Sequence, residues 1–484
     1  MTQLKNKRIL FVVPPITMTE VFGEMAEAGN ILPFQGILSL AALTRDRGYD
    51  TYFVDAFAEK LSQQEVSGRL KEIKPDYVGL TATTLVIPKA ALIASLAKKE
   101  FPNCKTIVGG PHFTAVPGET MKVYSDFDFG VIGEGEETLL ELLSFLDSGR
   151  KDYDRIKGVV YRTEDGQITE TPFRDLIQDL DQYPLPAWDL LPELKKYYIP
   201  SPENINRLPA VSLIVTRGCP MQCTFCFNSV DSRNRIPRWY STEKIIELID
   251  NLVDQHGIKE ISFLDDNLLA NRKKLRELCE ALIEKKYDLT WSCLGSCNFA
   301  DEELFRLMKK AGCWQISWGI EHACQEILDV YNKGIKVEQM VEGVKLAKKC
   351  GLVNRAFIMH GNFLETKETI EKNIDYLLKL PVSEFHAGFF IPLPGTIAYH
   401  QVEKYGRWNN GDNSWEAYGL FDKPIFIPKG LSEEILIKTL NQMYRRFYLR
   451  PKIVFYYVSK MIRHPSTFKR LLVTGLTFLK VYLK

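Results

Sequence analysis

The chain has 484 residues, of which 45% are hydrophobic and 11% aromatic, and its formal net charge is +1. This length predicts two or three domains with sizeable cores. The balanced charge and the hydrophobic content exclude a disordered chain and a protein that binds nucleic acid over much of its surface.

The N-terminus carries the short apolar run RILFVV, which ends at Pro14 and Pro15. This run predicts a first strand rather than a signal peptide, which would have a longer apolar region and a cleavage site of small residues. Ten cysteines in a chain without an export signal are expected to be reduced thiols. We therefore expect a cytoplasmic protein.

Residues 1–150 alternate apolar runs with helix-period segments. The runs RILFVV, DTYFVD, YVGLTA, KTIVGG and FGVIG predict the strands of a doubly wound, flavodoxin-like parallel sheet. Ligands of such sheets bind beyond the carboxyl ends of the strands. The candidate binding residues at these ends are Asp55, Thr83, Thr84, Gly109, Gly110, Pro111, Gly133, Glu134 and Gly135.

Residues 151–205 interrupt this alternation. Asp165 and Gly166 lie between two alternating segments and predict a small β-hairpin. The proline-rich stretch DQYPLPAWDLLPE that follows predicts an extended linker between two domains.

Residues 206–430 resume the alternation of apolar and helix-period segments. The six runs SLIVT, EISFLD, LTWSCLG, CWQISWG, LVNRAFIMHG and SEFHAGFFIP predict a partial (β/α)6 barrel. The chemistry of such a barrel is expected at the carboxyl ends of its strands. Cys219, Cys223 and Cys226 directly follow the first of these strands.

These three cysteines can hold a metal centre, because thiolate is the ligand preferred by zinc and by iron-sulfur clusters. A structural zinc site would need a fourth ligand, which Cys293, Cys297 or His256 could supply. A 4Fe-4S cluster needs only three cysteines and keeps one iron open to a small molecule. The position of the loop at a barrel mouth favours the cluster.

The cysteine loop, with Phe225 just before its last cysteine, resembles the signature loop of the radical S-adenosylmethionine (SAM) enzymes. The resemblance extends through LDDN (264–267), WGIEH (318–322) and PLPGT (392–396). The N-terminal domain points to the subgroup with a cobalamin-binding domain, which includes radical methylases and the anaerobic tetrapyrrole ester cyclase. The resemblance implies that SAM binds the open iron and is cleaved to a 5′-deoxyadenosyl radical, which removes hydrogen from an unactivated carbon.

The resemblance also implies residue roles. Cys219, Cys223 and Cys226 would be the cluster ligands, and Phe225 would lie beside the adenine. Glu321 would bind the polar end of SAM, although an ion-paired glutamate fits this position equally well. Asp265 and Asp266 would order SAM or substrate, or would only cap the loop. The segment HGNFL (360–364) departs from the glycine-proline-glycine turn expected there.

The first domain lacks one feature of many cobalamin domains, the motif Asp-x-His-x-x-Gly. Asp55 is present, but Phe57 stands in place of the histidine and Lys60 in place of the glycine. This excludes histidine ligation from this loop. It does not exclude cobalamin, because the resemblance to the SAM subgroup implies a cofactor held with its own base displaced and no histidine on cobalt. Gly109, Gly110 and other glycines would let the backbone approach the corrin tail. The alternative is a domain that no longer binds a cofactor.

Residues 431–484 are predicted to form a helical tail. From Ile435 onward there are eleven basic residues and no acidic one. On a helical wheel Lys469, Arg470, Lys480 and Lys484 lie opposite a large apolar face. The pattern predicts a helix that lies on a membrane surface, with a helix packed on the barrel as the alternative.

The predicted function is a radical SAM enzyme that uses a 4Fe-4S cluster and cobalamin to methylate an unactivated carbon of a hydrophobic, lipid-like substrate. One alternative is oxidation, cyclisation or rearrangement without methyl transfer, and another is a non-catalytic metal-binding protein. The chemistry implies an external electron donor of the flavodoxin or ferredoxin type. We expect no nucleic-acid partner.

Overall fold

The computed structural model describes residues 7–203, 205–411, 413–419 and 423–482. The chain divides into two compact units. One consists of Met1–Thr17 and Pro33–Tyr197, and the other of Met18–Leu32 and Tyr198–Lys484. The short segment after the first strand therefore belongs with the C-terminal half of the chain.

The N-terminal unit is built on a seven-stranded sheet of order β2-β1-β3-β4-β5-β6-β7. Its strands are β1 (Arg8–Val13), β2 (Asp50–Asp55), β3 (Tyr77–Thr81), β4 (Lys105–Gly109), β5 (Phe129–Val131), β6 (Val159–Arg162) and β7 (Ile168–Glu170). The first five are parallel, and their order 2-1-3-4-5 is that of flavodoxin-like sheets. The predicted fold of this part is confirmed.

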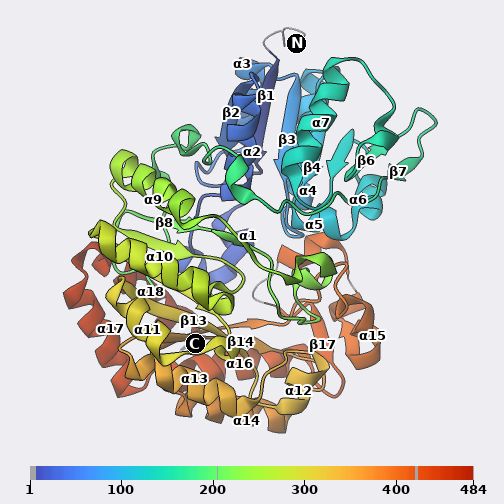
Figure 1. Cartoon of the computed structure of the whole chain (residues 1–484). Coiled ribbons are helices and arrows are strands. Elements are labelled where there is room, and N and C mark those ends of the chain that lie inside the picture. Colours follow the sequence, from blue (N-terminus) through green and yellow to red (C-terminus); the bar gives the residue numbers. More distant parts are fainter. Residues whose placement is uncertain (1–6, 204, 412, 420–422, 483–484) are drawn as a thin grey trace. The chain divides into compact units, whose positions relative to one another are not determined.

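Helices connect the parallel strands of this unit (Figure 1). They are α2 (Gln35–Asp46), α3 (Gln63–Ile73), α4 (Ile87–Glu100), α5 (Pro111–Ala115), α6 (Pro117–Val123) and α7 (Gly135–Asp147). The strands are almost fully buried because helices cover both faces of a doubly wound sheet. The predicted hairpin, β6 and β7, extends this sheet antiparallel to β5. A short helix, α8 (Leu194–Tyr197), ends the unit.

The second unit contains six parallel strands, with β8 and β15 at the two edges. They are β8 (Ala210–Leu213), β11 (Glu260–Phe263), β12 (Thr290–Gly295), β13 (Cys313–Glu321), β14 (Val353–His360) and β15 (Glu384–Phe389). Figure 1 shows their connecting helices, α9 (Thr242–His256), α10 (Arg272–Lys285), α11 (Glu302–Lys310), α12 (Gln325–Val330), α13 (Val337–Lys349) and α14 (Lys367–Lys379). The predicted partial (β/α)6 barrel is confirmed.

Local signals explain where these helices begin and end. The hydroxyl of Ser241 accepts a hydrogen bond from the backbone N–H of Lys244 at the start of α9, and Gly257 ends that helix with φ +63°. Asp301 caps α11 in the same way as Ser241 caps α9.

The chain then forms α15 (Val402–Tyr405), the hairpin β16 (Gly406–Trp408) and β17 (Phe426–Pro428), and three long helices. These are α16 (Glu433–Tyr448), α17 (Pro451–Arg463) and α18 (Phe468–Tyr482). Pro451 begins α17, because proline fits the first position of a helix but not its interior. The early segment α1 (Met18–Phe22) and the turn Gly23–Ala28 belong to this unit, and the turn packs against α18. The predicted helical C-terminus is confirmed.

Candidate active site

A buried carboxylate fixes the backbone between β8 and the cysteine loop. One oxygen of Asp265, which follows β11, accepts hydrogen bonds from the backbone N–H groups of Val215 (2.8 Å) and Thr216 (2.6 Å). Asp265 has no solvent exposure, and this burial raises its pKa to about 7. The predicted role of Asp265 as a loop cap therefore agrees with its contacts.

A glycine directs the chain into the loop. Gly218 has φ +97°, and a Cβ atom added there would lie 2.5 Å from the carbonyl oxygen of Asn234. The next residue, Cys219, donates its backbone N–H to that same oxygen over 2.9 Å. Only glycine allows this close approach, so the position of the first cysteine depends on Gly218.

The three thiols of the loop are largely shielded from solvent. Burial raises the pKa of Cys219 and of Cys226 to about 11 and also raises the pKa of Cys223. Without a metal the three side chains are therefore neutral thiols, and binding of a cluster would release their protons. Such a donor set of soft sulfur ligands on one loop fits an iron-sulfur cluster.

Asp266 lies on the solvent side of the cysteine loop. Its carboxylate accepts a hydrogen bond from the side-chain amide of Asn228 over 2.9 Å, and its charge adds to the effect of burial on the pKa of Cys219 and Cys226. The structure therefore brings Asp266 together with the cysteine loop. Its role toward SAM or substrate stays a prediction.

The turn between α12 and α13 forms two hydrogen bonds with the cysteine loop. The backbone N–H of Thr224 donates to the carbonyl of Tyr331 over 2.9 Å. The side chain of Asn332 donates to the carbonyl of Gln222 over 3.2 Å. These two bonds hold the loop on either side of Cys223.

This turn also supplies a buried charge that the sequence analysis missed. Lys333 Nζ lies 2.7 Å from Glu321 Oε1, and both side chains are about one tenth exposed. Burial opposes the charge of Lys333, but the carboxylate of Glu321 holds its pKa above the usual value. Glu321 itself has φ +60°, an uncommon conformation that is often found at functional sites.

Glu321 is thus ion-paired, as one of its two predicted descriptions required, while its binding to the polar end of SAM stays a prediction. The Lys333 ammonium group also lies 5.8 Å from the centre of the Phe225 ring. The one signal for Lys333 in the sequence is a lone lysine inside YNKG, between an aromatic residue and a glycine.

Aromatic side chains continue from the cysteine loop. Phe225 meets Tyr331 edge to face at 5.4 Å, and Tyr331 stacks on Phe363 at 5.2 Å. Phe363 in turn stacks on Tyr405 at 4.4 Å. Phe225 therefore lies at the end of a packed apolar cluster, where a flat ring could stack.

The segment 360–364, which departs from the expected glycine-proline-glycine turn, is fixed by a buried carboxylate. Glu365 accepts hydrogen bonds from the backbone N–H groups of Gly361 and Asn362. It also contacts His322 at 3.1 Å. Burial disfavours the charge of Glu365, but His360 and His322 hold its pKa below the usual value. These contacts hold Phe363 in the position where it stacks on Tyr331.

The alternative zinc ligands do not join the three cysteines. Cys293 contacts Cys313 in the core, and the side chain of Cys297 packs against Gly343. Within the described ranges, no group of three His, Cys, Asp or Glu side chains lies at the distances needed to hold a single metal ion.

In the N-terminal unit, the strand ends expose backbone suited to a close-fitting ligand. Gly110 has φ +97°, and a Cβ atom there would lie 2.9 Å from the backbone of Ala82. Gly133 has φ +75°. Thr83, Pro111 and Gly133 are exposed, while Gly109 and Gly135 are partly exposed. These residues fit the prediction that a cofactor approaches the backbone here.

Other predicted residues of this unit hold the strand ends themselves. Asp55 is buried and accepts a hydrogen bond from the backbone N–H of Ala58 over 2.9 Å. The hydroxyl of Thr84 lies 3.1 Å from Nδ1 of His112, whose pKa burial lowers to about 4. Glu134 accepts a hydrogen bond from the backbone N–H of Ile177 over 2.8 Å.

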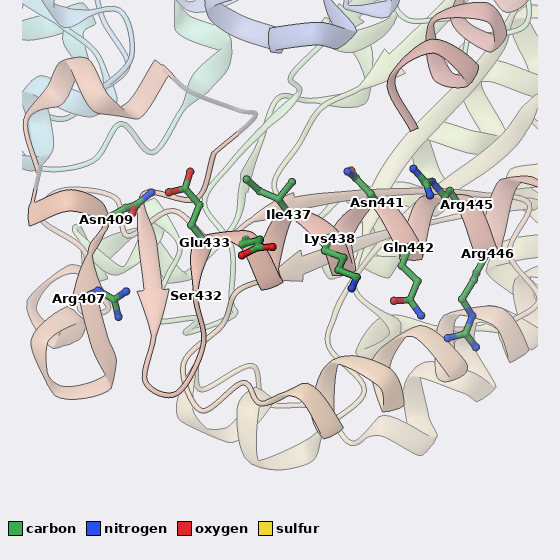
Figure 2. Close-up of a pocket in the computed structure, with 11 residues that line it drawn as sticks. Arg407, Asn409, Ser432, Glu433, Ile437, Lys438, Asn441, Gln442, Arg445 and Arg446 are labelled. Atoms are coloured by element: carbon green, nitrogen blue, oxygen red, sulfur yellow. The ribbon is translucent and has the colours of Figure 1, made fainter. Parts of the chain in front are cut away.

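A separate groove of about 1060 Å³ lies along α16 (Figure 2). Figure 2 shows Lys438, Asn441 and Arg445 on this helix and Arg407 from β16. Arg446 at its far end forms ion pairs with Glu371 and Asp375 of α14. The groove contains none of the predicted site residues, so we do not assign the active site to it.

Two family models match the chain, the radical SAM superfamily over residues 213–377 and the B12 binding domain over residues 24–143. An uncharacterized methyltransferase of Pyrococcus horikoshii is 33% identical over 481 residues, which is 99% of each chain. The anaerobic magnesium-protoporphyrin IX monomethyl ester cyclase of Rubrivivax gelatinosus is 31% identical over 94% of this chain and 79% of its own. The hopanoid C-3 methylase of Methylococcus capsulatus is 27% identical over 89% and 79%.

Solved structures show the same fold. The radical SAM methyltransferase TsrM of Kitasatospora setae, with cobalamin and a 4Fe-4S cluster bound, has a TM-score of 0.66 at 18% identity, over 83% of this chain and 75% of its own. The cobalamin-dependent radical SAM enzyme OxsB has a TM-score of 0.71 at 16% identity, over 95% and 72%. With the three-thiol loop on its partial barrel, the chain belongs to the radical SAM enzymes that carry a cobalamin-binding domain.

Proposed function

We propose that the enzyme transfers a methyl group to an unactivated carbon of a hydrophobic substrate. The observation that carries this proposal is the similarity, over 99% of both chains, to a relative named as a methyltransferase. It covers the three-thiol loop and the N-terminal sheet together. The hopanoid methylase among the relatives supports a lipid-like substrate.

The residues of the site fit the chemistry of SAM. Cys219, Cys223 and Cys226 would hold a 4Fe-4S cluster, which supplies the electron that cleaves SAM, while cobalamin supplies the cobalt that carries a methyl group. Glu321 and Lys333 present opposite charges, which complement the amino and carboxylate groups of SAM. The buried position of this pair excludes water and strengthens its attraction for those groups.

For the N-terminal unit, we propose that the exposed strand ends around Thr83, Gly110 and Gly133 bind cobalamin. Phe57 cannot coordinate cobalt, and His112 is already held between Thr84 and Thr120. The cofactor would therefore bind without a protein histidine on cobalt.

The product distinguishes methyl transfer from the other radical outcomes. Anaerobically reconstituted enzyme is incubated with methyl-deuterated SAM and a lipid extract of the source organism, and products are analysed by mass spectrometry. Methyl transfer yields a product that carries the deuterated methyl group. A product without the label would support oxidation or cyclisation. The similarity to the anaerobic cyclase is the reason to consider this alternative. A protein that binds zinc and no iron would contradict both.

We also propose the setting in which the enzyme works. A small molecule is its substrate, and an external flavodoxin-type or ferredoxin-type protein is its electron donor, because a cluster of this kind must be reduced before each cleavage. All ten cysteines are free thiols, which fits a reducing cytoplasm. A lipid-like substrate would place the enzyme at the inner face of the membrane.

A further inference from the structure

The last two helices of the chain are firmly attached to the second unit. In α17, Lys460 is buried and lies 3.1 Å from Glu384 at the start of β15, and Tyr456 donates to the same carboxylate over 2.9 Å. In α18, Leu471 is buried and Arg470 donates to the carbonyl of Gly29 over 3.1 Å. The prediction of a helix packed on the fold therefore holds for one side of each helix.

The other side of each helix is apolar and exposed. In α17, Phe455 is 72% and Ile462 is 76% exposed. The exposed large apolar side chains of the two helices are Val454, Phe455, Val458, Ile462, Phe468, Leu472, Leu476 and Leu479. We call this set the tail face. Its members recur three or four residues apart, so they lie along one side of each helix, and the two helices contact each other.

Such a face requires a partner, because soluble proteins rarely leave contiguous apolar patches of this extent in water. Most of the predicted apolar side of α18 is in fact exposed, while Leu471 and Tyr482 pack inward. The sequence analysis did not identify the contribution of α17. Leu483 and Lys484 of the predicted helix lie outside the described residues.

The exposed basic residues of α17 and α18 indicate which partner would cover the tail face. Lys452, Arg463, Lys469 and Lys480 are exposed on the same two helices. The sequence holds no acidic residue from Ile435 to its end, so no carboxylate of these helices offsets them. Apolar side chains between exposed basic ones are the pattern of helices that lie in the surface of an anionic bilayer. No helix in the described part of the chain is both long enough and apolar enough to cross a bilayer.

We propose that the tail face binds the surface of an anionic membrane, with α17 and α18 lying in the headgroup region. This inference deepens the proposed membrane location and rests on it, but it does not depend on methyl transfer. The buried pair of Lys460 and Glu384 would then fix the barrel relative to the membrane plane, so that the enzyme would stay bound at its source of lipid-like substrate.

Vesicle sedimentation of the full-length holoenzyme tests this proposal. The protein is expected to sediment with vesicles of phosphatidylglycerol and phosphatidylcholine and much less with phosphatidylcholine alone. The double variant Phe455→Ser/Ile462→Ser should weaken binding by at least about tenfold, because two large apolar side chains no longer leave water. Lys469→Glu/Lys480→Glu should remove the preference for anionic vesicles.

Controls separate this proposal from its alternatives. Val123→Ser removes an exposed apolar side chain from α6 and should not change binding. Unchanged vesicle binding by both double variants would overturn the proposal. So would self-association at rising protein concentration that the Phe455→Ser/Ile462→Ser variant abolishes, because a second copy would then cover the face. 5′-Deoxyadenosine formation is measured on every variant, and loss of methyl transfer with intact vesicle binding would count only against the proposed reaction.

Discussion

Lys333 places a positive charge where a cluster and SAM would meet. Its ammonium group is buried, pairs with Glu321 at 2.7 Å and lies 5.8 Å from the ring centre of Phe225. Removal of one partner of a buried ion pair leaves the other charge uncompensated, which costs about 3–5 kcal/mol. Replacement of Lys333 should therefore have a larger effect than replacement of an exposed lysine.

We expect Lys333→Met to weaken SAM binding at least tenfold, because the carboxylate of SAM loses its cationic partner and Glu321 is left unpaired. The measurement is the SAM dissociation constant of reconstituted enzyme, together with its iron content. Lys345→Met, which changes an exposed lysine of α13, is the matched control and should bind SAM normally. Equal affinity in the two variants would show that Lys333 does not contact SAM.

The three cysteines provide a second test at this scale. Replacement of Cys219, Cys223 or Cys226 by alanine should remove bound iron and sulfide and abolish 5′-deoxyadenosine formation, because each thiol supplies one cluster ligand. Cys350→Ser, at a cysteine that contacts the carbonyl of Glu302 at the start of α11, should retain both. A full complement of iron in any of the three variants would contradict the cluster assignment.

Asp265 makes stability depend on pH. Burial raises its pKa from 3.8 to about 7, so its ionised form is disfavoured in the folded state. The stability that protonated Asp265 contributes is complete below about pH 4 and is lost as the pH rises toward 7. Asp265→Asn cannot ionise, so its thermal stability relative to the unmodified protein should increase over this range.

At the scale of elements, most strands and helices could be predicted from the sequence. The runs EISFLD and LVNRAFIMHG correspond to β11 and β14, because buried parallel strands are continuously apolar. The predicted cysteine loop and the acids after β11 also lie together. The burial of Lys333 could not be predicted, since it depends on a turn that is distant in sequence from the cysteines. The place of residues 18–32 in the second unit could not be predicted either, because it also depends on packing between segments that are distant in sequence.

Gly218 shows how an element positions the site. Gly218→Ala should displace Cys219, because the new Cβ would lie 2.5 Å from the carbonyl of Asn234 at φ +97°. We expect a loss of bound iron and a stability loss of about 1–3 kcal/mol. Gly257→Ala is a matched control, since Gly257 also has a positive φ but has open space around it. It should lower the melting temperature and leave the iron content unchanged.

At the scale of the whole molecule, the candidate residues for the two cofactors lie in different compact units. The cysteine loop lies on the barrel, and the exposed strand ends of the flavodoxin-like sheet lie in the N-terminal unit. Each unit has its own sheet and core. Since the two sets of residues lie in different units, we expect loading of the two cofactors to be separable by mutation.

Thr83→Trp places a large side chain over the exposed strand ends, where Thr83 is solvent-exposed and can be replaced without disturbing the core. This variant should lose cobalamin, measured by its visible absorption, and keep a full complement of iron.

The triple variant Cys219→Ala/Cys223→Ala/Cys226→Ala should lose iron and keep bound cobalamin. Its bound cobalamin, reduced to Co(II), should show no nitrogen coupling in the electron paramagnetic resonance spectrum, because Phe57 replaces the histidine ligand and the cofactor's own base is expected to be displaced. Val123→Trp, on the exposed side of α6, is the control for added bulk. Normal cobalamin content in Thr83→Trp would place the cofactor elsewhere, and nitrogen coupling would show that a histidine or the cofactor's own base binds the cobalt.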